Sequence, residues 1–98
     1  RSGLALEQEL GRSRRIGRIS SNIALVFMRI DNFDSALAYQ KVCLQQYEKT
    51  KYDAGLANSL SIIGMTQVKL GKFQDAIASA KRAIKLSEPS HFFQEMNY

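Results

Sequence analysis

The apolar positions of the chain form helical stripes separated by short polar breaks. In the first half they recur every three or four residues, as one face of an α-helix requires. The members of this first stripe are Ile16, Ile19, Ile23, Val26, Phe27 and Ile30. After the polar pair Asp31–Asn32 a second stripe runs from about Phe33 to Tyr47, with Phe33, Ala36, Leu37, Gln40, Cys43 and Leu44 in phase. The pattern predicts two helices joined by a tight turn.

The second half of the chain shows the same arrangement. Its first stripe consists of Leu56, Leu60, Ile63 and Leu70, and after a break at Gly71–Lys72 a helix is expected from Phe73 to Leu86. We expect Gly71 to end a helix in the left-handed conformation, with Asp31 or Asn32 taking this place less comfortably in the first half. Pro89 cannot continue a helix, and Ser90 is suited to cap the next one.

When the sequence is aligned with itself so that Phe33 pairs with Phe73, the two halves align without gaps. Such self-similarity is typical of repeat arrays. The same alignment pairs Ala36 with Ala76, Lys41 with Lys81 and Ile23 with Ile63. The register divides the chain into the end of a preceding repeat (1–11), repeat one (13–50), repeat two (53–89) and the start of a following helix (90–98). We therefore expect an all-α fold and a single fragment of a longer array. A non-repeating helical bundle is the alternative.

The repeats resemble the tetratricopeptide repeat, in a variety whose period is longer than usual, at about 40 residues. In repeat two the pattern is carried by Ile63–Gly64, Gly71, Phe73, Ala76, Ala83 and Pro89; in repeat one by Ile23–Ala24, Phe27, Phe33, Ala36 and Cys43. Aromatic positions of the family are replaced by Ser20, Leu60, Gln67, Gln40 and Ala80. The resemblance implies a right-handed superhelix (solenoid) of antiparallel helix–turn–helix repeats. It also implies repeat-packing roles for Ile23, Phe27, Phe33, Ala36, Cys43, Ile63, Gly64, Phe73, Ala76 and Ala83.

Alanines occupy one predicted face of the last helix, where larger residues are usual. We expect Gly64, Ala76 and Ala83 to let helix backbones approach closely. At Ala80 the family usually has an aromatic residue, so this position requires a bulky neighbour such as Tyr39 or Phe92, or else leaves a small cavity.

The resemblance also implies a concave groove, lined by the first helix of each repeat, that binds an extended peptide or a partner helix. The corresponding residues are Arg18, Ser21, Asn22, Leu25, Met28 and Arg29 in repeat one, and Asn58, Ser61, Met65, Val68 and Lys69 in repeat two. Asparagine both donates and accepts hydrogen bonds, and methionine adapts to varied apolar partners. The flanking Arg18, Arg29 and Lys69 favour an acidic segment or one that carries a C-terminal carboxylate. Ser21, Leu25, Ser61 and Met65 occupy places where one subset of the family grips a terminal carboxylate, so that clamp is disfavoured.

The charge of the chain is basic, with 14 Lys and Arg against 9 Asp and Glu and a net charge of +5. Arg12, Arg14, Arg15 and Arg18 lie close together in the sequence. Either they solvate the start of a helix or they form a patch for an acidic partner. Nucleic acid binding is disfavoured, because the tyrosines and phenylalanines are better explained by packing.

No catalytic or metal site is expected, and no cofactor. With one histidine (His91) and one cysteine (Cys43), a familiar set of metal ligands cannot be assembled. Cys43 is best explained as a small core residue, and a lone cysteine fits a reducing compartment such as the cytoplasm. No apolar run approaches the roughly 20 residues that span a membrane, and a chain that begins at Arg1 suggests an excised fragment.

Three functions fit these observations. The first is a non-catalytic protein–protein interaction module, which the resemblance associates with sensor or regulatory parts of larger signalling proteins. The second is a structural assembly or dimerisation element that self-associates through exposed repeat ends. The third is an accessory domain of an enzyme whose catalytic domain lies elsewhere.

Overall fold

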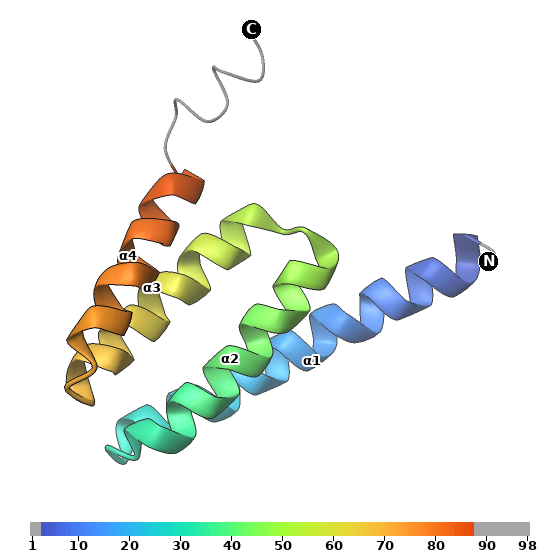
Figure 1. Ribbon diagram of the computed structural model, residues 1–98. Helices are drawn as coiled ribbons and strands as arrows, with labels where there is room; N and C mark the ends of the chain where they lie inside the picture. The colour runs from blue at the N-terminus through green and yellow to red at the C-terminus, as the bar shows by residue number, and fades with distance from the viewer. Residues whose placement is uncertain (1–2, 88–98) are drawn as a thin grey trace, which may run out of the picture.

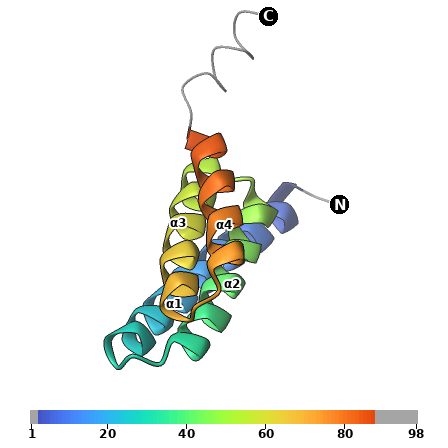
Figure 2. The ribbon, with the colours of Figure 1, turned by 60° about the vertical axis from the view of Figure 1, so that its left-hand side comes forward.

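The computed structural model describes residues 3–87, which form four helices. They are α1 (Gly3–Arg29), α2 (Phe33–Thr50), α3 (Asp53–Lys69) and α4 (Phe73–Ser87). Between residues 3 and 87 there is no strand. Successive helices run antiparallel, and α1 and α3 lie on one side of the molecule with α2 and α4 on the other (Figures 1 and 2). The predicted all-α helical repeat is confirmed.

Each of the three turns contains one residue in the left-handed conformation, namely Asp31 (φ 60°), Lys51 (φ 53°) and Gly71 (φ 76°). At the last turn the Gly71 N–H donates to the carbonyl of Val68 (3.0 Å) and the Lys72 N–H to that of Gln67 (2.8 Å). The same pair of bonds occurs at the other two turns, so all three are Schellman motifs. The prediction for Gly71 is confirmed, and Asp31 rather than Asn32 takes the left-handed position. The Asn32 side chain instead caps α2 by accepting from the Ser35 N–H.

Several helices are longer than the sequence indicated. Helix α2 continues past Tyr47 to Thr50, and α4 ends at Ser87. Helix α1 begins at Gly3 and passes without a break through residues 11–13, where the repeat register placed a boundary. The division of the chain into repeats stays a prediction. Residues 88–98, including Pro89 and Ser90, lie outside the described range.

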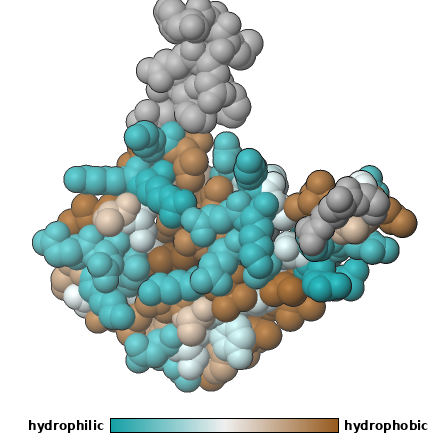
Figure 3. Space-filling model, turned by 45° about the vertical axis from the view of Figure 1, so that its right-hand side comes forward, coloured by the Kyte–Doolittle hydropathy of each residue, from teal (hydrophilic) through white to brown (hydrophobic). Residues whose placement is uncertain are grey.

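The apolar stripe predicted for α1 is wrong in part. The side chains of Val26 and Ile30 are 58% and 64% exposed, and Ile16 and Ile19 are exposed as well. The buried residues of α1 are Gly17, Ser20 and Ala24, with Ile23 and Phe27 half-buried. The reason is close packing: a Cβ atom on Gly17 would lie 3.4 Å from the Gln46 Cβ of α2. Small residues therefore face α2, and apolar side chains reach the surface among hydrophilic ones (Figure 3).

The core lies along α2 and α3, and each helix packs on its neighbours in chain order. Its apolar members are Ala24, Ala36, Leu37, Cys43, Leu56, Leu60, Ile63, Ala76 and Ala83. A Cβ atom on Gly64 would lie 3.4 Å from the carbonyl oxygen of Ala76, so α3 and α4 approach closely. Ala80, by contrast, is exposed and lines an open groove. Of the two neighbours suggested for it, Tyr39 stacks on Phe27 instead, with ring centroids 5.7 Å apart, and Phe92 lies outside the described residues.

Candidate functional site

The residues predicted to line the concave groove are exposed, apart from Met28, which is half-buried. The Met28 sulfur accepts a hydrogen bond from the Thr66 hydroxyl (3.5 Å), which links α3 to α1. A small cavity of about 20 Å³ also spans the two helices; it is lined by Ser21 of α1, Gln40 and Cys43 of α2, and Ser59 and Ile62 of α3. Of the predicted groove residues, Ser21 lines this small depression between α1 and α3. We call this depression the α1–α3 groove.

Three of the predicted groove residues line a different surface. Ser61, Met65 and Val68 lie along a cavity of about 540 Å³ between α3 and α4. Its other lining residues are Gly64, Phe73, Ala76, Ile77, Ala80, Ala83, Ile84 and Ser87. We call it the α3–α4 groove. Phe73, expected to pack between repeats, is 61% exposed at its edge. The candidate residues are thus not gathered on one surface.

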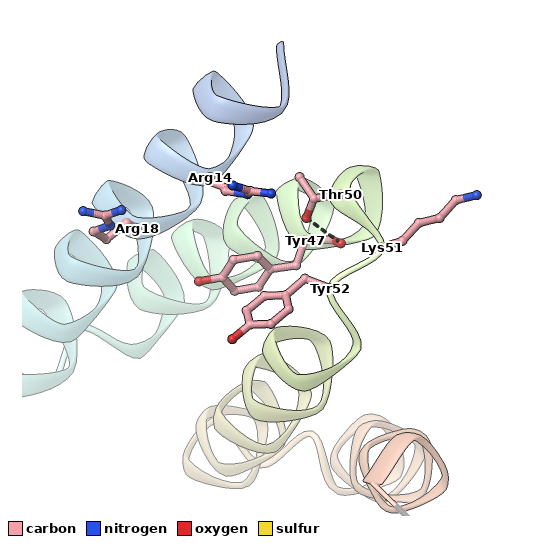
Figure 4. Close-up of a pocket in the computed structure, with 6 residues that line it drawn as sticks. All are labelled: Arg14, Arg18, Tyr47, Thr50, Lys51 and Tyr52. Carbon is pink, nitrogen blue, oxygen red and sulfur yellow. Dashed lines mark hydrogen bonds between the residues drawn. The ribbon is translucent and has the colours of Figure 1, made fainter. Parts of the chain in front are cut away.

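A third depression lies between α1 and the turn that joins α2 to α3. It has a volume of about 430 Å³ and is lined by Arg14, Arg18, Tyr47, Thr50, Lys51 and Tyr52 (Figure 4). We call it the basic pocket. The predicted arginine cluster is therefore split, because Arg14 and Arg18 line this pocket whereas Arg12 lines a separate depression with Glu9 and Lys49. Arg15 lines neither of the two.

Two glycines shape the basic pocket. Gly17 brings α1 against α2, since a Cβ atom there would lie 3.5 Å from the Tyr47 ring. Arg14 and Arg18 stand on either side of Gly17 in the sequence, so this close approach brings them beside Tyr47. A Cβ atom on Gly55 would lie 2.5 Å from Tyr52 Cδ2, so Gly55 leaves room for the Tyr52 ring.

The two tyrosines pack edge to face, with centroids 5.6 Å apart and planes at 82°. A hydrophobic contact of this kind commonly accompanies a Schellman motif, and at the Lys51 turn the two residues in contact, Tyr47 and Tyr52, are also joined by the Tyr52 N–H to Tyr47 carbonyl hydrogen bond. Their hydroxyls point to the same side (Figure 4). Burial raises the pKa of Tyr47, Cys43 and Tyr52 raise it further, and Arg18 opposes the shift. Tyr47 is therefore a neutral hydroxyl, able to donate a hydrogen bond, at physiological pH.

The tyrosines of the basic pocket were assigned only to packing by the sequence analysis. A usable signal was present, because Arg14 and Arg18 are one helical turn apart on one helix face, and two tyrosines flank a helix end. The sequence could not show that these two features meet, since the turn at Asp31 and most of α2 separate them along the chain.

No metal site is found in the part of the chain that the structure describes, where no three His, Cys, Asp or Glu residues are grouped to hold an ion. His91 lies outside that part. Cys43 is buried, and its sulfur lies 3.8 Å from the Ser59 hydroxyl. None of the described helices is both long and apolar enough to cross a membrane.

Comparison with known proteins gives one result. The tetratricopeptide repeat profile matches residues 15–88. No significant match was found among curated proteins or solved structures. Because the matched residues cover α2, α3 and α4 entirely and the second half of α1, the chain belongs to the tetratricopeptide repeat family, whose members are generally non-catalytic protein-interaction modules.

Proposed function

We propose that this chain binds an extended peptide of a partner protein along the α1–α3 groove. The observation that carries the proposal is the set of side chains left exposed on the first helix of each hairpin. Leu25 supplies an apolar contact, and Asn22 and Asn58 supply hydrogen bonds to a peptide backbone.

The charges beside the groove favour an acidic peptide. Arg18, Arg29 and Lys69 are exposed, and between Glu9 and Asp31 the chain carries five arginines and no acidic residue. Such a field attracts and orients an oppositely charged segment before contact forms. We assign the module to a regulatory or sensor part of a larger signalling protein in the cytoplasm, where its single cysteine, Cys43, stays reduced.

The test is selection of peptides from a displayed random library, followed by affinity measurement. Leu25→Ala combined with Asn22→Ala is expected to weaken the binding of the selected acidic peptides by about tenfold or more. The matched control is Gln45→Ala with Lys49→Ala, which truncates two exposed residues of α2, outside the groove. Equal loss in both variants would remove the support for the groove.

A second candidate function is self-assembly through the α3–α4 groove. Phe73, Ile77 and Ile84 expose apolar side chains along it, which is unusual for a free surface. In this case the chain sediments as a concentration-dependent dimer, and Ile77→Glu with Ile84→Glu returns it to a monomer. A wild-type chain that is monomeric at all concentrations contradicts assembly and leaves the peptide proposal standing.

A further inference from the structure

We propose that the basic pocket binds a phosphate monoester, carried by a phosphorylated side chain of the partner peptide. The choice of a peptide as carrier rests on the function proposed above, because Arg18 lines the pocket and is also one of the residues predicted from the sequence to bind the peptide. The phosphate chemistry itself rests on the pocket alone.

The first argument is uncompensated charge. Arg14, Arg18 and Lys51 line the pocket, and none of the acidic residues between positions 3 and 87 does. Glu48 is the acid next to Tyr47 in sequence, and its carboxylate is bound to Arg82 (3.0 Å). Arg14 and Arg18 are also one helical turn apart, and like charges at this spacing repel each other. A ligand with close to two negative charges offsets this repulsion better than a single carboxylate can.

The second argument is the supply of hydrogen-bond donors. Each guanidinium presents a planar fork of N–H groups that fits phosphate oxygens. Arg14 points toward Thr50 and Tyr47, the tyrosine hydroxyls project on the side of Arg18, and Lys51 extends outward at the rim (Figure 4). A phosphate monoester offers three strongly accepting oxygens, which matches a pocket lined by several donors.

The third argument is that nearby acceptors are already occupied. The Tyr47 carbonyl accepts from the Thr50 hydroxyl (3.2 Å) and from the Tyr52 N–H (3.1 Å). The Glu48 carbonyl accepts from the Lys51 N–H (3.3 Å). These carbonyls are therefore not free to accept hydrogen bonds from the pocket cations, although the negative end of the α2 dipole lies beside them. Helix α3 begins directly after Tyr52 with no side chain capping it, and Asp53 in its first turn is the acid that faces the positive end of its dipole.

The fourth argument is size. A volume of about 430 Å³ lies within the range of small-molecule sites and exceeds the space that one carboxylate fills. The two tyrosine rings form one wall, and Tyr52 is more than half exposed. A ligand that carries its phosphate on an aromatic ring can therefore place the ring against Tyr52 and the phosphate near the arginines.

The experiment titrates the full chain with phenyl phosphate at about pH 7.5 and follows the arginine side-chain N–H and tyrosine ring signals by NMR. Benzoate, which has the same ring and one negative charge, is the matched ligand. We expect phenyl phosphate to shift the signals of Arg14, Arg18 and the two tyrosines, and to bind about tenfold more tightly than benzoate or better. Equal binding of the two ligands would overturn the proposal.

Arg14→Gln and Arg15→Gln form the matched pair of variants, since both arginines are exposed on α1 and each change removes one charge. Arg14→Gln is expected to weaken the binding of phenyl phosphate by about tenfold or more, because it removes a charge-assisted hydrogen bond. Arg15→Gln is expected to leave it nearly unchanged. Equal losses would show that only the general charge of α1 matters, and the pocket would be rejected.

A degenerate library of phosphoserine and phosphotyrosine peptides then tests the carrier. A phosphorylated partner is supported by peptides that bind more tightly than phenyl phosphate and whose affinity falls in both the Arg14→Gln and the Leu25→Ala variants. If phenyl phosphate binds through Arg14 but no phosphopeptide exceeds it, the ligand is a free small phosphate and the peptide carrier is wrong. Failure of the groove variants alone contradicts the proposed function and leaves the phosphate chemistry of the pocket standing.

Discussion

Single residues in this chain are constrained mainly by how closely two helices approach. Gly17, Gly55 and Gly64 stand where a Cβ atom would meet a neighbouring side chain or carbonyl. Gln40 shows the opposite situation, since its side chain is 6% exposed and its Oε1 has no hydrogen-bond partner among the described residues. The repeat register aligns Gln40 with the exposed Ala80, so the polar group has no counterpart in the second hairpin.

Replacing Gln40 with methionine is expected to raise the free energy of unfolding by about 1 kcal/mol, because the change removes a buried acceptor without a partner and keeps the side-chain length. Urea denaturation measures the effect. Gln45→Met, on the exposed side of α2, serves as the control and should change stability little. A clear loss of stability in Gln40→Met would mean that the amide is satisfied in solution.

The raised pKa of Tyr47 predicts a loss of stability in alkali. The folded-state pKa lies above the ordinary value of 10.0, so the unfolded chain loses this proton first as the pH rises. The stabilisation is therefore complete below about pH 10 and is lost as the pH rises through the folded-state pKa. In Tyr47→Phe this contribution is absent. We expect the stability of wild type relative to Tyr47→Phe to be constant near neutrality and to fall in alkali, as measured by denaturation at each pH.

At the scale of elements, the turns determine where each helix ends. The three left-handed residues, Asp31, Lys51 and Gly71, are evenly spaced, so α2 with its turn and α3 with its turn occupy the same length of chain. Only one of the three is glycine, and a non-glycine residue in this conformation costs about 1–2 kcal/mol. The turns at Asp31 and Lys51 therefore hold strain that the hydrogen bonds of the Schellman motif offset.

Lys51→Gly is expected to raise the free energy of unfolding by up to about 1 kcal/mol by relieving this strain. Lys49→Gly removes the same charge inside α2, just before the turn, and is expected to lower stability by about 1 kcal/mol. If the backbone conformation determines the change in stability, thermal denaturation will show that Lys51→Gly stabilises the protein and Lys49→Gly destabilises it. Two effects of the same sign would point to the lost charge instead.

The contact between α3 and α4 depends on small residues. We expect Ala76→Leu to lower the free energy of unfolding by about 1–3 kcal/mol, because Ala76 is buried where Gly64 approaches its carbonyl. Ala78→Leu adds the same volume at an exposed position of α4 and should cost little. Chemical denaturation of both variants decides the matter, and similar losses in the two would argue against close packing.

At the scale of the whole molecule, the helices differ in how many neighbours cover them. Among the four described helices, the backbones of α2 and α3 each lie close to two others, whereas those of α1 and α4 each lie close to one. We expect amide hydrogen exchange to be slowest in α2 and α3 and fastest in residues 3–13 of α1. Protection of residues 3–13 that equals protection of the core would indicate that a second molecule covers them.

Much of this architecture could be predicted from the sequence, because helix periodicity and the turn glycine are local signals. The repeat register located the turns at Asp31 and Gly71, and the family resemblance was correct. The sequence failed where packing rather than hydropathy decides burial. The stripe of isoleucines in α1 was assigned inward, although Gly17, Ser20 and Ala24 allow a closer approach to α2. The basic pocket was missed because it forms only when α1 meets the turn at Lys51.

The backbone of each helix lies close only to that of its neighbours in chain order, and this bears on how the molecule folds. The backbone contacts join residues of consecutive helices, so none requires the closure of a loop much longer than one hairpin. Chains dominated by such short-range contacts fold in about microseconds to milliseconds. Folding can therefore begin in the α1–α2 or the α3–α4 hairpin and spread along the chain to the other.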